Sequence, residues 1–149
     1  MSYQELDFIA DVYIPILFMI SLLVVSRAAV CQGVKSQVSQ WLNLLSSIAT
    51  VYMVKAADDY YQLWPLLGLD YSTHTALALV FVVFLSSKSL TFLMLSVTSM
   101  LLYIALMMYQ NYHTFYDVMV TSLVVLPLFF VLSRLFTKLL THDLLSEKH

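Results

Sequence analysis

The chain has 149 residues, of which 61% are hydrophobic and 11% are charged, and its mean hydropathy is +0.86. Soluble domains average about 25% charged residues, so this composition excludes a typical soluble domain and predicts an integral membrane protein. The net charge of −2 says little by itself, and the single cysteine, Cys31, excludes an internal disulfide and a cysteine-based metal site.

Five apolar segments come close to the ~20 helical residues that a bilayer requires. Each is continuously apolar rather than alternating, so helices are expected instead of strands. In chain order, the predicted spans are 8–26, 41–57, 71–87, 89–109 and 114–136. They predict an all-α bundle of five transmembrane helices in one domain, followed by a short cytoplasmic tail over 137–149. The acidic N-terminus is unlike a cleavable signal peptide, so the first span is expected to be retained.

The basic residues predict the orientation of this bundle. Six of the seven lysines and arginines fall on one side of the predicted spans: Arg27, Lys35, Lys88, Arg134, Lys138 and Lys148. The positive-inside rule makes that side cytoplasmic, which places the N-terminus outside and the C-terminus inside a plasma or inner membrane. The opposite side carries most of the acids, with Lys55 as its only cation.

This topology gathers three residues that can carry chemistry on the outer side: His74, His113 and Asp117. A carboxylate at the centre of a membrane helix costs roughly 2.5–3.5 kcal/mol, and ionisable groups in a membrane indicate function by default. Because residues i and i+4 share one face of a helix, Asp117 is expected to reach the imidazole of His113.

Two segments resemble motifs of a known enzyme superfamily. Residues 71–75, Tyr-Ser-Thr-His-Thr, resemble the Pro-Ser-Gly-His-Ser/Thr motif of type 2 phosphatidic acid phosphatases, and more closely the Ser-Gly-His-Thr motif of the related sphingomyelin synthases. Residues 113–118, His-Thr-Phe-Tyr-Asp-Val, are similar to the His-x3-Asp-Val motif that opens the last core helix in both. Lys55 and Gln62 imperfectly match the phosphatase Lys-x6-Arg-Pro motif.

The sequence also departs from these patterns. Gln62 stands where the phosphatases have arginine, and Thr73 replaces the motif glycine. The Ser-Arg pair that precedes the last phosphatase histidine is absent, as it is in sphingomyelin synthases. The family core usually has six spans, so the first would be missing here.

The resemblance implies a lipid phosphatase or lipid head-group phosphotransferase that forms a phosphohistidine and needs no cofactor. His113 would attack phosphorus while Asp117 holds its other ring nitrogen, and His74 would serve as acid and then base. A neutral imidazole is a competent nucleophile near neutral pH, and a second one near its own pKa works in both directions. Lys55, Gln62 and Ser72 would bind the phosphoryl oxygens.

The absence of arginine on the outer side bears on the substrate. A phosphate monoester carries nearly two charges and usually meets arginine forks. A singly charged lipid phosphodiester in the outer leaflet is therefore at least as well suited to this site as phosphatidate.

Several alternatives remain open on the sequence alone. His74, His113 and Asp117 could bind zinc or iron, or the two histidines could ligate haem. The chain could be a non-catalytic membrane subunit that keeps the phosphatase-like fold, or a small transporter with His113 and Asp117 as a proton relay. A homo-oligomer or a membrane partner protein is compatible with so thin a bundle, whereas nothing indicates nucleic acid.

Overall fold

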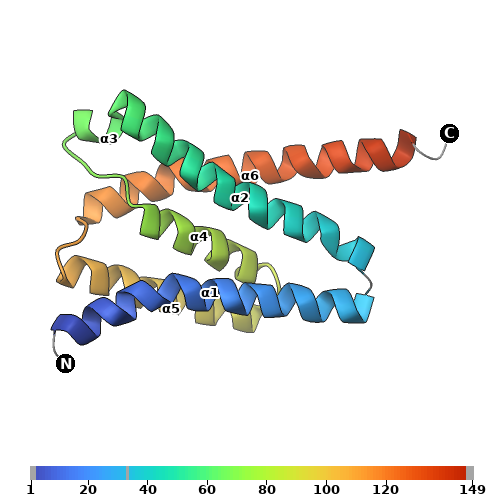
Figure 1. Ribbon diagram of the computed structural model, residues 1–149, viewed down its shortest axis with the longest axis horizontal. Helices are drawn as coiled ribbons and strands as arrows, with labels where there is room; N and C mark the ends of the chain where they lie inside the picture. The colour runs from blue at the N-terminus through green and yellow to red at the C-terminus, as the bar shows by residue number, and fades with distance from the viewer. Residues whose placement is uncertain (1–2, 33, 147–149) are drawn as a thin grey trace.

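The computed structural model describes residues 3–32 and 34–146, and over these ranges the chain folds into helices with no strand (Figure 1). The helices are α1 (Tyr3–Gln32), α2 (Val34–Tyr61), α3 (Leu63–Leu66), α4 (Thr73–Ser86), α5 (Leu90–Tyr109) and α6 (Phe115–Ser146). The predicted all-α class and the five main helices are confirmed. The four-residue α3, in the connection between α2 and α4, is an addition that the sequence did not predict.

Three of the helices are long and apolar enough to cross a membrane: α1 over Tyr3–Cys31, α5, and α6 over Phe115–Leu132. α4 is apolar, but its 14 residues fall short of a full span. α2 does not reach the same hydropathy within the described ranges, because it carries more polar side chains. α6 continues as helix through Ser146, into the segment expected as a tail, and residues 147–149 of that tail lie outside the described residues.

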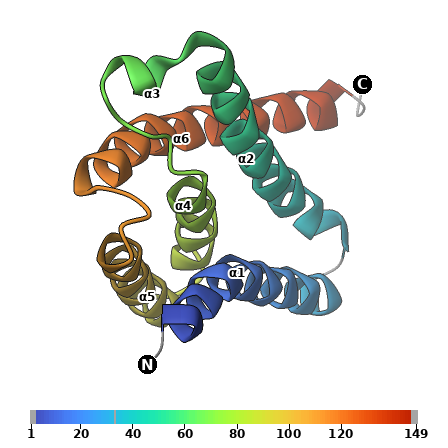
Figure 2. The same ribbon diagram turned by 60° about the vertical axis from the view of Figure 1, so that its left-hand side comes forward.

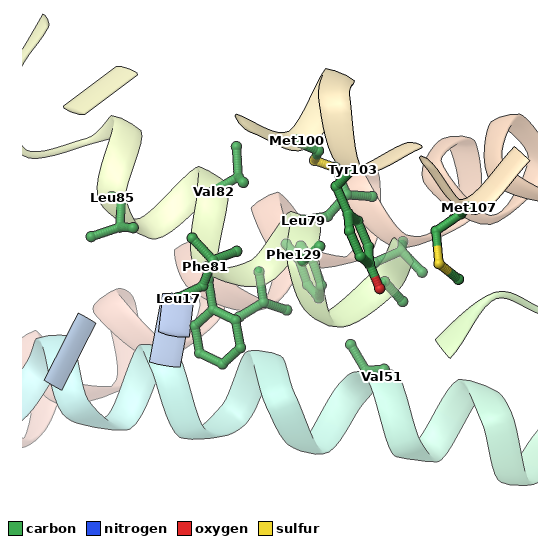
Figure 3. Packing of buried hydrophobic residues seen from close by; sticks show 14 of the residues in the cluster. Leu17, Val51, Leu79, Phe81, Val82, Leu85, Met100, Tyr103, Met107 and Phe129 are labelled. Atoms are coloured by element: carbon green, nitrogen blue, oxygen red, sulfur yellow. The ribbon is translucent and has the colours of Figure 1, made fainter. Parts of the chain in front are cut away.

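α4 forms the centre of the bundle, and α1, α2, α5 and α6 all contact it (Figure 2). A helix that is apolar all round is typical of a protein core or of a membrane span, and eight of the 14 residues of α4 are buried. Figure 3 shows side chains of the surrounding helices, including Val51, Tyr103 and Phe129, gathered against residues of α4. The core therefore consists of α4 and its four neighbours.

The antiparallel packing gives the bundle two distinct ends (Figure 1). At one end α1 begins, α2 ends in α3, α4 begins, and α5 turns into α6; we call this the histidine end. At the other end lie the connections from α1 to α2 and from α4 to α5, the latter containing Lys88; we call this the Lys88 end. The length of the helices thus separates the end that carries the two histidines from the end that carries Lys88.

Polar side chains link neighbouring helices within the apolar bundle. The hydroxyl of Tyr13 in α1 lies 3.0 Å from the hydroxyl of Ser99 in α5, and the Tyr13 ring stacks on Tyr103 with centroids 4.1 Å apart. Ser86 and Ser96 pair in the same way between the end of α4 and α5, at 3.1 Å. Such hydroxyl contacts commonly hold helices together where apolar burial alone provides little driving force.

The packing of α2 on α4 generates a first prediction. Val51 is fully buried, whereas Met53, two residues further on, is 70% exposed. Because the core has no room for a larger ring, Val51→Phe should lower the free energy of unfolding by about 1–3 kcal/mol. The measurement is unfolding of the purified protein in detergent, with Met53→Phe as the matched control. An equal loss in both variants would contradict the packing described above.

Candidate functional site

The end of α5 determines where His113 lies. The N–H of Asn111 donates to the carbonyl of Met108, and the N–H of Tyr112 donates to that of Met107, each at 3.1 Å. This is the Schellman arrangement that closes many helices, and it needs a residue in the left-handed conformation. Asn111 supplies it, with φ at 57°, a conformation that asparagine tolerates better than most residues. The chain then turns through His113 into α6.

The start of α6 is fixed by a capping box between Thr114 and Asp117. The Asp117 N–H donates to Thr114 Oγ1 at 3.2 Å, and the Thr114 N–H donates to Asp117 Oδ2 at 2.7 Å. Thr114 Oγ1 also donates to Asp117 Oδ2 at 2.8 Å. Each side chain satisfies backbone groups that a helix start leaves unpaired. Asp117 is therefore a structural residue of this helix terminus, whatever else it does.

The start of α4 is tied to α6 in a similar manner. Ser72 is the N-cap, and its hydroxyl accepts from the N–H of Thr75 at 3.3 Å. The N–H of Ser72 donates to Thr121 Oγ1 of α6 at 3.2 Å, and both residues are fully buried. His74, the second residue of α4, is exposed.

Asp117 also joins the two termini. Its Oδ1 accepts from the backbone N–H of Asp70 at 2.9 Å, just before the start of α4. The carboxylate thus receives three hydrogen bonds, from Asp70 and Thr114, while the residue is only 4% exposed. Burying a charge is costly unless it is hydrogen-bonded, and here the bonds fix the segment before His74 to the segment after His113.

The two histidines line one pocket of about 290 Å³ at the histidine end. Its other lining residues come from α1, α5 and the turn after α5: Ala10, Asp11, Tyr103, Met107 and Tyr112. Two of its polar atoms, Nδ1 of His113 and the hydroxyl of Tyr103, are buried without a hydrogen-bond partner. Unsatisfied buried polar atoms are uncommon in folded proteins, and both of these belong to residues that line this pocket.

The surroundings of His113 favour its neutral form. Burial lowers the pKa of this imidazole below 6.5, and proximity to His74 lowers it further. The carboxylates of Asp117 and Asp70 oppose this effect without overcoming it. His113 therefore presents a neutral ring to the pocket at pH 7, the protonation state that a nucleophile or general base requires.

The structure differs from the expected contact between His113 and Asp117. The expectation placed both residues on one helix face, but α6 begins at Phe115, so His113 lies before the helix. The hydrogen bonds of the Asp117 carboxylate go to Asp70 and Thr114, and Nδ1 of His113 has no partner. Asp117 acts on His113 through its charge and through the position of the turn.

The three residues expected to bind phosphate lie outside the pocket of the two histidines. Lys55 forms an ion pair with Asp59 one turn further along α2. Gln62 lies at the N-cap position of α3 in a left-handed conformation without a side-chain capping bond, and its side-chain amide donates to the carbonyl of Asp59 at 2.9 Å. Ser72 is buried as the cap of α4. None of these three is among the residues that line the pocket.

Sequence reasoning missed Asp11, Tyr103 and Tyr112 as pocket residues. Asp11 carried a usable signal, because it is an acid inside the first apolar segment, where charged residues are expensive. Tyr103 and Tyr112 carried no such signal in the sequence, since aromatic residues are common in apolar helices and at their ends. Nearby, the Tyr112 hydroxyl and the Gln110 amide both donate to Asp7 Oδ1, at 2.9 and 2.6 Å, which ties the turn after α5 to α1.

The described side chains contain no group of three histidine, cysteine, aspartate or glutamate residues arranged to hold a metal ion. The set of His74, His113 and Asp117 considered from the sequence does not form one, because the Asp117 oxygens face Asp70 and Thr114. The donor set at the pocket is therefore two imidazoles and the exposed carboxylate of Asp11.

Comparisons of the chain with models of protein families, with curated proteins and with solved structures found no match.

The capping box predicts a measurable loss of stability. Thr114→Val keeps the shape of the side chain and removes the hydroxyl that pairs with Asp117. The lost cap should cost about 0.5–2 kcal/mol of stability, measured by unfolding in detergent. Thr114→Ser retains the hydroxyl and should cost much less, whereas equal losses in both variants would contradict the assigned bonds.

The environment of His113 predicts a pH dependence. The pKa of His113 is lower in the folded protein than in the unfolded chain. The stability that the neutral ring contributes is therefore complete above about pH 6.5. This contribution is lost as the pH falls through that value toward the lowered pKa of the folded state. His113→Gln should therefore flatten the decline in melting temperature on acidification. His142→Gln is the matched control, and an unchanged slope in His113→Gln would overturn the prediction.

Proposed function

We propose that the protein is a membrane-embedded lipid phosphatase or lipid head-group phosphotransferase that works through a phosphohistidine. The observation that carries the proposal is the pocket shared by His74 and His113, in which one ring is held neutral and has an unpartnered nitrogen. The order of the two histidine motifs along the chain and their resemblance to the phosphatase superfamily support the same chemistry.

In the first step, a ring nitrogen of neutral His113 attacks the phosphorus atom. A P–N bond forms, the bond from phosphorus to the leaving oxygen breaks, and protonated His74 donates a proton to that oxygen. The imidazolium-like charge that develops on His113 is stabilised by the nearby carboxylates of Asp117 and Asp70.

In the second step, the now neutral His74 takes a proton from water or from the hydroxyl of an acceptor lipid. The resulting oxygen nucleophile attacks phosphorus, the P–N bond breaks, and His113 returns to its neutral state. Water gives hydrolysis, whereas a lipid hydroxyl gives head-group transfer. Both histidines recover their starting protonation, so the cycle balances without a cofactor.

The charges around the pocket favour a phosphodiester substrate. Among the described residues, the pocket is lined by the carboxylate of Asp11 and by no lysine or arginine, and Lys55 is already paired with Asp59. A doubly charged monoester would meet repulsion there, whereas a singly charged diester would meet less. A head group that also carries a positive charge would pair with Asp11.

The membrane orientation forms part of the proposal. We place the three long apolar helices α1, α5 and α6 across the bilayer with α2 and α4 packed among them, and with the histidine end extracytoplasmic and the Lys88 end cytoplasmic, as the distribution of basic residues predicts. Large apolar side chains are exposed on the outer helix faces, among them Phe8 and Leu102 at 67% and 68%. Such faces suit contact with lipid tails, and a lipid substrate would enter laterally with its tails in the bilayer.

A second candidate is a non-catalytic membrane subunit that keeps this fold. Two observations favour it: Asp117 is used in capping, and Lys55, Gln62 and Ser72 lie away from the pocket. A protein that had lost its phosphate-binding groups would keep these structural contacts. The following experiment separates the two candidates.

The test uses purified full-length protein and a nitrophenyl ester of phosphocholine, beside phosphatidate as the monoester. His113→Ala should lower kcat/KM by about three orders of magnitude or more, because the nucleophile is lost. In His74→Ala, nitrophenolate still leaves without an acid, so His113 carrying the phosphocholine group should accumulate and turn over about 10²–10⁴-fold more slowly. The phosphoenzyme is measured by mass spectrometry.

His142→Ala, near the far end of α6, is the matched control and should retain wild-type turnover. Strong preference for phosphatidate would contradict the assignment of a phosphodiester substrate but not the catalytic roles of the two histidines. No turnover of either substrate, together with retained biological activity in His113→Ala, would favour the non-catalytic subunit.

A further inference from the structure

A second pocket of about 290 Å³ lies at the Lys88 end, between α2, α4 and α6. Its polar lining consists of Gln40, Asn43, Ser47, Ser87 and Lys88. The rest is apolar, namely Leu44, Val80, Val83, Phe84, Phe129 and Phe130. One pocket thus combines a polar end with a long apolar wall, which matches the two parts of a lipid molecule.

Lys88 supplies the positive charge of this pocket. Its ammonium donates to the side-chain oxygen of Gln40 and lies 4.2 Å from the centre of the Phe84 ring. No carboxylate of the described residues pairs with it, and burial lowers the pKa of the ammonium. A half-buried cation without an anionic partner is unfavourable, and an anion in the pocket would relieve that cost.

Asn43 supplies an unused acceptor. Its side-chain oxygen is buried and has no hydrogen-bond partner, and Asn43 is one of the residues that line the pocket of Lys88. The neighbouring Ser47 and Ser87 donate their hydroxyls to carbonyls of their own helices, at 2.8 and 2.7 Å. The pocket therefore lacks a hydroxyl or amine donor at Asn43, which a polyol head group would provide.

The apolar wall extends toward the surface of the bundle. Phe129 is buried, whereas Phe130 is 58% exposed, so the wall continues from the core to a face of α6 open to the surroundings. An acyl chain could lie against these rings and Val83 while the head group stays at Lys88. A free phosphate or nucleotide would leave this wall uncovered, which argues for a lipid.

We propose that this pocket binds an anionic glycerophospholipid, with its phosphate on Lys88, a head-group hydroxyl on Asn43 and one acyl chain along Phe84, Phe129 and Phe130. The site lies at the opposite end of the bundle from the two histidines (Figure 1). Lipid binding at this pocket requires no catalysis at the histidine pocket.

The test measures binding of phosphatidylglycerol and of phosphatidylcholine to the full-length protein in detergent by native mass spectrometry. Wild type should bind phosphatidylglycerol more tightly. Lys88→Gln should lose about tenfold in phosphatidylglycerol affinity, because a charge-assisted hydrogen bond is removed, and should change phosphatidylcholine binding little. Arg134→Gln removes an exposed cation of α6 outside the pocket and should keep the preference.

A second variant tests the cavity without changing charge. Ser47→Phe places a ring in the pocket and should reduce binding of phosphatidylglycerol. Equal losses in Lys88→Gln and Arg134→Gln would mean general electrostatic attraction and would overturn the site. Displacement of the lipid by an equal concentration of inorganic phosphate would also overturn it, since the occupant would then be a soluble anion.

Discussion

The histidine end depends on the buried carboxylate of Asp117. A charge taken out of water needs several strong hydrogen bonds, and the backbone of Asp70 and the two donors of Thr114 provide them. Because Asp70 precedes α4 and Thr114 opens α6, satisfying this one carboxylate fixes two chain segments to each other. His74 comes shortly after Asp70, and His113 comes just before Thr114. Their shared pocket therefore depends on the buried carboxylate of Asp117.

The central position of α4 explains how this arrangement is supported. The helix is apolar on all sides and is covered by α1, α2, α5 and α6, so its axis and its start are set by the core. The buried cap Ser72 and its bond to Thr121 then lock the first turn of α4 against α6. His74 stands on a rigid helix start, while its partner ring stands on a turn held by the Schellman closure of α5.

The same helix separates two pockets of contrasting electrostatics. The histidine pocket includes the carboxylate of Asp11, and the opposite pocket includes the ammonium of Lys88. The lining of each pocket also includes a residue with a buried polar atom that has no partner, namely Tyr103 and His113 at one pocket and Asn43 at the other. A bundle of this size therefore offers two cavities with polar groups in their lining, one toward each end of an apolar body that suits a bilayer.

Much of this could be predicted from the sequence, because continuous apolar runs determine helices whatever their neighbours are. The five main helices, the all-α class and the proximity of His74 to His113 follow from those runs and from antiparallel connections. The sequence could not assign the partner of Asp117, since spacing suggests a shared helix face and only the helix start at Phe115 shows that His113 lies outside it. Lys55 and Gln62 illustrate the same limit: motif order placed them near phosphate, but local bonds to Asp59 hold them away from the pocket.

Tertiary packing alone brought Asp11 and Tyr103 to the pocket, because contacts between distant helices depend on how side chains fill the core and not on the periodicity of any one segment.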